Sequence, residues 1–204
     1  MMKGAILVIS GPSGAGKSSL INEMLKRCDD VYFSISTTTR EMREGEKEGR
    51  EYHFISKEQF EKEIEEGEFL EWAKVHDNYY GTSLKPVKKA LQEGKLVVFD
   101  IDVQGQKIVK RKFSNILTSV FLTTPSLSVL KERLSKRATD SKEIIQNRIK
   151  NALLEIEEIK NYDFLIINDD FQKALKELLC AAKVARLKTS LVDLENFIQT
   201  WKEG

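Results

Sequence analysis

Residues 5–18 read AILVISGPSGAGKS, and this stretch decides the fold. The apolar run at residues 5–9 predicts a buried strand, and residues 11–18 match the phosphate-loop pattern G-x-x-x-x-G-K-[ST]. Residues 17–26 then place apolar side chains three and four positions apart, as on one face of a helix. The order of strand, loop and helix is the context that this motif requires, and it predicts a phosphate-binding site.

Each residue type in this loop suits a nucleotide phosphate. Glycines let backbone N–H groups turn inward around the anion, and the following helix adds the positive end of its dipole. Lys17 supplies a mobile positive charge, and the hydroxyl of Ser18 can ligate Mg²⁺. The expected ATP-binding residues of the loop are Gly11, Pro12, Ser13, Gly14, Ala15, Gly16, Lys17 and Ser18.

Short apolar runs alternate with helical periodicity along most of the chain. The runs at residues 5–9, 96–99, 119–122 and 164–167 predict buried parallel strands. Helices are expected at residues 17–26, 127–136, 143–159 and 171–187, with one more terminal helix at 191–202. This alternation is typical of an α/β fold in which helices pack on a parallel sheet.

Residues 37–91 break the alternation. They are rich in charge and glycine, and they combine a short apolar run at 52–55 with one helical pattern at 57–66. Between Glu41 and Glu71 there are 12 acidic and 5 basic residues, although the whole chain has a net charge of +1. The remainder is therefore basic, and we expect residues 37–91 to form an inserted subdomain with a different task.

The composition excludes several classes of protein. A net charge of +1 offers no overall field for nucleic acid or for an anionic membrane. No apolar run approaches the ~18 residues of a membrane span, and the run at 5–9 is too short for the core of a signal peptide. Cys28 and Cys180 lack metal-ligand spacing and do not suggest a disulfide framework. We therefore expect a reduced cytoplasmic protein without nucleic-acid or membrane partners.

A pair of acidic residues follows the second expected strand. Asp100 and Asp102 are two positions apart, so an extended chain would point both side chains to one face at the carboxyl edge of the sheet. A carboxylate there can hold Mg²⁺, directly or through water, or a polar group of the substrate. Asp102 and Gly105 also fit the D-x-x-G element of GTPases, but an N-K-x-D element is absent, so a GTPase is the weaker interpretation.

Several ordered motifs make the chain resemble guanylate kinases over about residues 3–187. They are the phosphate loop, SISTTTR at 34–40 with Arg43, Gly45-Glu46, Tyr52, FLEWA at 69–73, NYYG at 78–81, DIDVQG at 100–105 and IND at 167–169. The resemblance implies a three-layer P-loop fold with core segments at 1–33, 92–133 and 151–204. It also implies a mixed α+β GMP-binding insert at about 34–91 and a helical lid at about 134–150.

The resemblance also assigns residues to the GMP site. Arginine guanidinium groups and tyrosine hydroxyls are suited to a phosphate dianion, and a glutamate can accept both adjacent donors of guanine. Thr82 stands where the family often has serine. The implied GMP-binding residues are Ser36, Arg40, Arg43, Tyr52, Glu71, Tyr80, Thr82 and Asp102.

The remaining assignments concern ATP and the transferring phosphoryl group. Arg133, Arg137 and Arg148 match lid positions that act in catalysis with Lys17, and Asn168 matches a position beside adenine. Ser18 and Asp100 are the expected Mg²⁺ residues. No catalytic base is needed, because the attacking phosphate oxygen is already ionised.

The sequence thus predicts a kinase that transfers the γ-phosphoryl group of ATP to GMP. Two alternatives stay open. The first is a non-catalytic domain of this family that binds phosphorylated peptides, although such domains typically lose the phosphate loop. The second is a related kinase with another phosphorylated acceptor, such as a ribose phosphate. The oligomeric state and the role of residues 191–204 are left open by the sequence.

Overall fold

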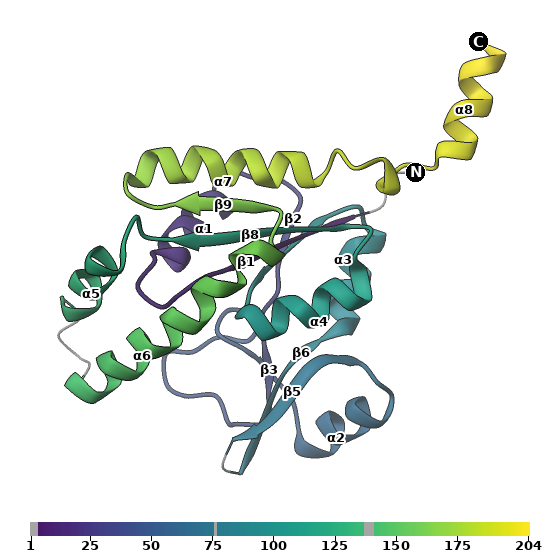
Figure 1. The fold of residues 1–204 in the computed structure, drawn as a ribbon. Helices are drawn as coiled ribbons and strands as arrows, with labels where there is room; N and C mark the ends of the chain where they lie inside the picture. The colour runs from purple at the N-terminus through teal and green to yellow at the C-terminus, as the bar shows by residue number, and fades with distance from the viewer. Residues whose placement is uncertain (1–3, 76, 137–140) are drawn as a thin grey trace.

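A five-stranded parallel sheet forms the centre of the protein in the computed structural model, which describes residues 4–75, 77–136 and 141–204 (Figure 1). Its strands are β1 (Ala5–Ser10), β2 (Val31–Phe33), β7 (Leu96–Asp100), β8 (Leu117–Thr123) and β9 (Phe164–Ile167), in the order β2-β7-β1-β8-β9. β1 lies in the middle, with Ile6 level with Val97 on one side and Leu117 on the other. The predicted P-loop fold with a parallel core sheet is confirmed.

Alternate residues of β1 face two different hydrophobic cores. Leu7 and Ile9 pack with the helices α1 (Lys17–Leu25) and α7 (Phe171–Ala185) on one face of the sheet. Ile6 and Val8 pack with α3 (Leu84–Gln92) and α4 (Val103–Phe113) on the other face. Every residue of β1 is buried, which explains why its sequence is a continuous apolar run and does not alternate with polar residues.

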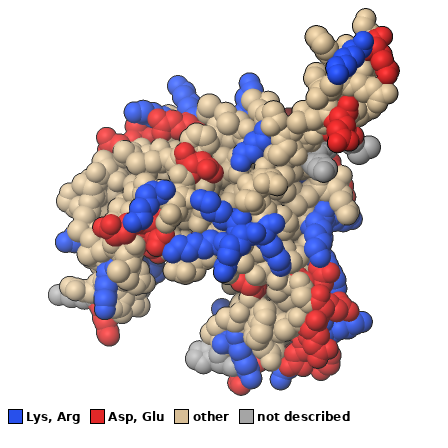
Figure 2. Space-filling model, turned by 45° about the vertical axis from the view of Figure 1, so that its right-hand side comes forward, with Lys and Arg blue, Asp and Glu red and all other residues tan. Residues whose placement is uncertain are grey.

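A second sheet lies below the first in Figure 1. It has the order β4-β3-β6-β5 and consists of β3 (Thr37–Thr38), β4 (His53–Phe54), β5 (Phe69–Val75) and β6 (Asn78–Ser83). The helix α2 (Lys57–Glu65) covers it with Phe60, whose buried ring stacks on Phe69 at 4.1 Å and on Tyr79 at 5.2 Å. Figure 2 shows acidic side chains gathered on this lower lobe, as the charge count predicts.

Two helices project beyond the carboxyl edge of the core sheet. They are α5 (Leu127–Ser135) and α6 (Lys142–Glu155), and they share a small core of Leu130, Leu134 and Ala152. The sequence predicts one continuous helix at 143–159. The structure instead changes at Glu155 from α-helix to the 3₁₀ helix η1 (Ile156–Asn161), which brings the chain into β9.

The sequence reasoning missed β2, α3 and α4. α3 lies inside the range expected for the insert, yet Leu84, Val87 and Ala90 pack against the core sheet. The terminal helix α8 (Leu194–Glu203) starts three residues later than the expected 191, after the 3₁₀ turn η2 (Thr189–Leu191). Within the described ranges, no helix combines the length and the apolar composition needed to span a membrane.

Candidate active site

The phosphate loop joins β1 to α1 in a conformation that only glycine adopts without strain. Gly11 and Gly16 have φ angles of 142° and 91°, in the left-handed region. A Cβ atom on Gly11 would lie 1.9 Å from the carbonyl oxygen of Leu122, and one on Gly16 would lie 2.4 Å from Nδ2 of Asn168. The two glycines are therefore required by both the turn and the close approach of neighbouring groups.

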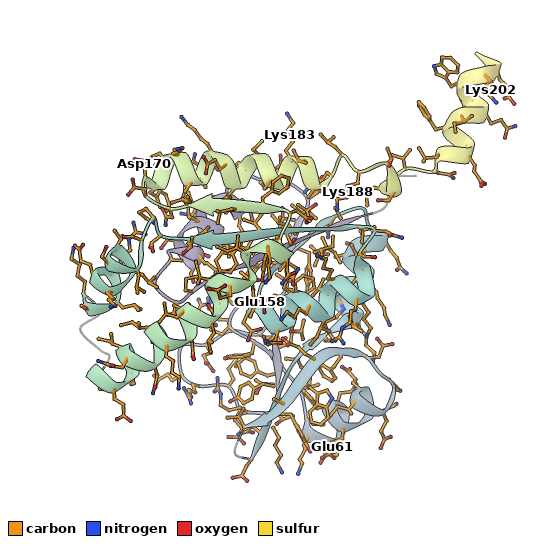
Figure 3. The ribbon with its side chains drawn as sticks, viewed as in Figure 1. Glu61, Glu158, Asp170, Lys183, Lys188 and Lys202 are labelled. Atoms are coloured by element: carbon orange, nitrogen blue, oxygen red, sulfur yellow. The ribbon has the colours of Figure 1, made fainter. Side chains whose placement is uncertain are left out.

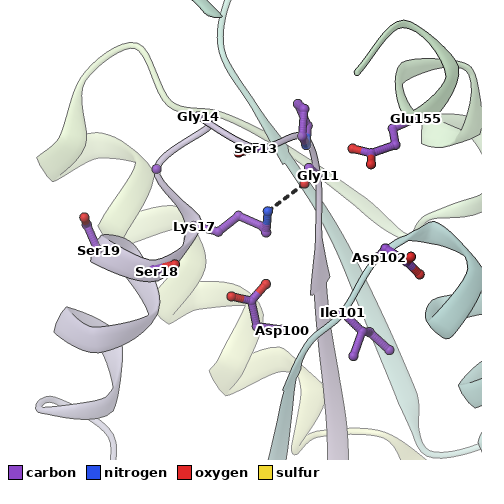
Figure 4. A pocket seen from close by; sticks show the side chains of 12 residues that line it. Gly11, Ser13, Gly14, Lys17, Ser18, Ser19, Asp100, Ile101, Asp102 and Glu155 are labelled. Atoms are coloured by element: carbon purple, nitrogen blue, oxygen red, sulfur yellow. Dashed lines mark hydrogen bonds between the residues drawn. The ribbon is translucent and has the colours of Figure 1, made fainter. Parts of the chain in front are cut away.

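A cavity of about 380 Å³ lies over this loop (Figure 4). The ammonium group of Lys17 points across it and donates a hydrogen bond of 2.6 Å to the carbonyl oxygen of Gly11. Carboxylates from β7, the start of α4 and the end of α6 complete the wall. The lining side chains beyond the loop are Ser19, Asp100, Ile101, Asp102 and Glu155. The cavity thus combines inward-facing glycine backbone, one lysine and three acids.

Asp100 and Asp102 both line this cavity but do not form the predicted pair on one strand. Asp100 ends β7, and burial raises the pKa of its carboxyl group, with Lys17 opposing the shift. Asp102 lies outside the strand and caps α4, because its Oδ1 accepts hydrogen bonds from the backbone N–H groups of Gln104 at 2.9 Å and Gly105 at 2.8 Å. The D-x-x-G match is therefore the first turn of a helix.

The expected Mg²⁺ residues, Ser18 and Asp100, line the same cavity. A hydroxyl and a carboxylate are the hard oxygen donors that suit Mg²⁺, which keeps several waters and binds substrate phosphates. In the described part of the chain, no three His, Cys, Asp or Glu side chains form a metal site. The residues therefore fit an ion that arrives with a nucleotide rather than one enclosed by the protein.

Asn168 stabilises the phosphate loop through a side-chain hydrogen bond. Its buried side-chain amide donates to the carbonyl oxygen of Ala15 at 2.8 Å, and the backbone carbonyl oxygen of Asn168 accepts a hydrogen bond of 2.9 Å from Nη2 of Arg133. Arg133 is thereby tied to the loop through Asn168. The predicted contact of Asn168 with adenine stays a prediction, since the described contacts of this side chain serve the loop.

Arg148, a second arginine predicted for the lid, contacts the loop directly. Nη1 of Arg148, on α6, donates to the hydroxyl of Ser13. This contact ties α6 to the loop that lines the phosphate cavity. Arg137, the third predicted lid arginine, lies outside the described residues.

A smaller cavity of about 250 Å³ opens in the second sheet. Ser36, Glu71, Tyr80 and Thr82, all predicted GMP residues, line it together with Trp72, Ala73 and Gly81. Burial raises the pKa of Glu71, the charge of Asp102 raises it further, and a 3.5 Å hydrogen bond from Thr82 opposes both effects. A half-buried carboxylate with an unmatched acceptor is thus available to a ligand with N–H donors.

Arg40 lies over the aromatic rings of Tyr52 and Phe54. Its guanidinium carbon lies 5.6 Å from the centroid of the Tyr52 ring, and the side chain hydrogen-bonds Tyr80. Nη2 also forms an ion pair of 2.7 Å with Glu46, whose other carboxylate oxygen accepts the backbone N–H of Arg43 at 2.8 Å. Hydrogen bonds from Arg40 and from the Arg43 backbone lower the pKa of Glu46.

Arg43 itself is exposed, unlike the other members of the predicted phosphate set.

Two acidic residues to which the sequence analysis assigned no role also belong to the site. Glu46 orients Arg40, and Glu155 faces the phosphate cavity, where burial and the charge of Asp102 raise its pKa while Lys17 lowers it. Glu46 could have been found from its place between Arg43 and Tyr52 in the motif series, whereas no local signal marks Glu155.

Comparisons with known proteins agree with one another. The family model for guanylate kinase matches residues 3–183. The guanylate kinase of Sulfurimonas denitrificans is 54% identical over 200 residues, which cover 98% of this chain and 97% of that protein. That of Campylobacter jejuni is 50% identical over the full length of both chains. A crystal structure of guanylate kinase from Anaplasma phagocytophilum superposes with a TM-score of 0.73 at 28% identity, covering 98% of this chain and 96% of the other.

Proposed function

The chain belongs to the guanylate kinase family and transfers the γ-phosphoryl group of ATP to GMP, and we propose that its two cavities hold the two substrates. The observation that carries this assignment is the lining of the two cavities. The phosphate loop with Lys17, Asp100 and Asp102 lines the larger one, and Ser36, Glu71, Tyr80 and Thr82 line the smaller one. One cavity thus suits the phosphates of ATP and the other suits a base with N–H donors.

The donor side holds ATP by its phosphates. The loop N–H groups and Lys17 bind the phosphate oxygens, and the bond from Lys17 to Gly11 holds the ammonium group ready for them. Ser18 and Asp100 would hold Mg²⁺, which would offset negative charge on the phosphates when bound.

The acceptor side recognises GMP at both ends. Glu71 accepts hydrogen bonds from N1–H and the exocyclic amine of guanine, and Ser36, Thr82 and Asp102 contribute further polar contacts. Arg40, Arg43, Tyr52 and Tyr80 bind the phosphate dianion. Adenine presents no matching donor pair, so the site discriminates by leaving Glu71 unpaired when AMP binds.

The lid completes the transfer. Arg133, Arg137 and Arg148 place guanidinium groups near the equatorial oxygens of the transferring phosphoryl group, and Asn168 contacts the adenine side. Contacts from Arg133 and Arg148 to the loop region keep two of these arginines at the cavity. We assign residues 34–91 to the GMP-binding insert, with α3 at its end packed on the core sheet, and residues 134–150 to the lid. We place the enzyme in the cytoplasm.

A coupled assay of ADP formation tests the substrate assignment. GMP, AMP, CMP and UMP are offered separately with ATP and Mg²⁺, and turnover is expected with GMP alone at comparable concentration. Omitting Mg²⁺ should abolish the signal. Equal turnover with AMP, or with a ribose phosphate, would contradict the role of the Glu71 cavity.

A further inference from the structure

Glu155 is a half-buried acid in the wall of the phosphate cavity (Figure 4). Its Oε2 atom is buried, and within the described part of the chain no donor lies at hydrogen-bond distance from it. A buried acceptor without a partner destabilises the folded protein, and a charged one does so more strongly. An unsatisfied group of this kind in a ligand cavity indicates that the ligand supplies the missing donor.

A neighbouring acid shows that this segment of the chain offers partners for carboxylates. Glu158, labelled in Figure 3, lies three residues further on, in η1. One of its carboxylate oxygens accepts a hydrogen bond from Nζ of Lys107 at 2.8 Å, and the other accepts one from Nδ2 of Asn161 at 2.6 Å. The protein thus satisfies both oxygens of Glu158, whereas it leaves Oε2 of Glu155 without a partner.

The helix α6 fixes Glu155 at the phosphate loop. Arg148 and Glu155 are seven positions apart, which is about two helical turns, so both lie on the same face of α6. Nη1 of Arg148 donates to the hydroxyl of Ser13, and Ser13 also lines the cavity. One face of the helix therefore presents both a cation and an acid to the site.

The charges around the cavity favour a ligand that brings a cation. The described lining residues include one cation, Lys17, and three acids, Asp100, Asp102 and Glu155. Lys17 already donates to the carbonyl oxygen of Gly11 at 2.6 Å. Nucleotide phosphates add further negative charge, so the three carboxylates would repel them unless a cation arrives with them. Mg²⁺ is that cation for ATP, and it keeps several of its waters when it binds.

We propose that Glu155 accepts hydrogen bonds from water molecules on the Mg²⁺ that ATP brings, so that α6 distinguishes Mg²⁺-bound ATP from free ATP. The proposal rests on the assignment of the donor cavity to ATP, and it adds Glu155 to Ser18 and Asp100, the residues expected to hold the ion. Carboxylates outside the first coordination sphere orient the groups bound to a metal. Because Glu155 acts through water, it is a positioning residue.

An arginine of the lid is the alternative partner for Glu155. An arginine that closed over the nucleotide and paired with Glu155 would strengthen nucleotide binding to a similar degree with and without Mg²⁺. A contact to water on the metal strengthens binding only when the metal is present. The dependence of affinity on Mg²⁺ therefore separates the two partners.

Calorimetric titration of the full chain with the non-hydrolysable analogue β,γ-imido ATP tests the proposal without GMP. Each protein is titrated with Mg²⁺ and with EDTA, and the ratio of the two dissociation constants is called the Mg²⁺ enhancement. Glu155→Gln should lower this enhancement about tenfold, since loss of an outer-sphere partner typically costs about 10- to 100-fold in metal affinity. Its affinity in EDTA should equal that of wild type or be up to about threefold higher, because one carboxylate fewer faces the phosphates.

Glu157→Gln is the matched control. Glu157 is exposed, lies two residues beyond Glu155 and carries the same charge, so the Mg²⁺ enhancement of this variant should stay within about twofold of wild type. Glu155→Gln should melt at a temperature no lower than wild type in circular dichroism, because it loses a buried charge that has no partner. A lower melting temperature with weaker binding in both Mg²⁺ and EDTA would show a structural role and overturn the proposal.

Mn²⁺ in place of Mg²⁺ reports on the metal directly, because electron paramagnetic resonance detects the free ion. Its dissociation constant from the complex of enzyme and analogue should rise about tenfold in Glu155→Gln and stay within about twofold in Glu157→Gln. An unchanged Mg²⁺ enhancement, or equal losses of affinity with and without the metal, would overturn this proposal alone. A wild-type protein that does not bind the analogue would overturn the assignment of the donor cavity and this proposal with it.

Discussion

The donor and acceptor cavities are built in different ways. The donor cavity is formed largely by backbone, because glycines at positive φ turn the chain around the phosphate position and the Gly11 carbonyl already holds Lys17. The acceptor cavity is lined mainly by side chains, of which Thr82 hydrogen-bonds Glu71, and Arg40 of the predicted phosphate set is paired with Glu46. A backbone site is ready before its ligand arrives, whereas a side-chain site must exchange internal partners for the ligand.

The largest expected effect comes from the donor cavity. Lys17→Ala removes the only loop cation, and we expect kcat to fall at least about 10³-fold, or about 4 kcal/mol of transition-state stabilisation. GMP affinity measured by calorimetry should stay within about twofold, because the acceptor cavity does not include Lys17. Activity within about tenfold of wild type would contradict the role of Lys17.

The next effect separates base recognition from phosphate recognition. Glu71→Gln replaces an acceptor oxygen by an NH₂ donor opposite a guanine donor, so we expect kcat/KM for GMP to fall roughly 30- to 1,000-fold, or about 2–4 kcal/mol. AMP, which lacks the donor pair, serves as the control substrate and should change far less. An unchanged ratio of kcat/KM between GMP and AMP would remove Glu71 from base recognition.

The sequence predicts a site well when its residues are contiguous in the chain, and less well when they come from distant segments. The donor loop is contiguous, so residues 11–18 predicted the strand, the turn and the helix together. Glu155 reaches that cavity from the end of α6, far along the chain, and no spacing rule finds it. Asp102 was expected on a strand because the pattern does not show that β7 ends at Asp100.

The missed elements have physical causes as well. β2 has only three residues, all partly buried, so it lacks the continuous apolar run that identified β1. α3 lies within the charged range 37–91, so its apolar face was not separated from the insert, and proline at Pro86 is tolerated in the first turn of the helix. The second sheet nevertheless lies within the range whose charge and glycine content differ from those of the core.

A smaller effect tests whether Glu46 holds Arg40 ready for GMP. Glu46→Gln removes the ion pair and weakens the bond to the Arg43 backbone, so we expect KM for GMP to rise about three- to tenfold with kcat nearly unchanged. Glu41→Gln, in the same loop, is the control, since only the Glu41 backbone carbonyl contacts Arg40. A lower KM would instead mean that Glu46 competes with the GMP phosphate for Arg40.

The smallest expected effect is the pH dependence of KM for GMP. Burial and the charge of Asp102 raise the pKa of Glu71, so protonation begins at a higher pH than for an ordinary glutamate. The protonated carboxyl group accepts one fewer hydrogen bond from guanine. The KM for GMP should therefore rise as the pH falls toward that raised pKa, about two- to fivefold between pH 7.5 and 5.5.

Other groups titrate in the same range. Burial also raises the pKa of Asp100 and of Glu155, and the GMP phosphate gains its second proton near pH 6. Those groups titrate equally in wild type and in Glu71→Gln, so the difference between the two profiles isolates Glu71. We expect the variant's KM to start higher at pH 7.5 and to rise less steeply, and parallel profiles would show that the charge of Glu71 does not govern GMP binding.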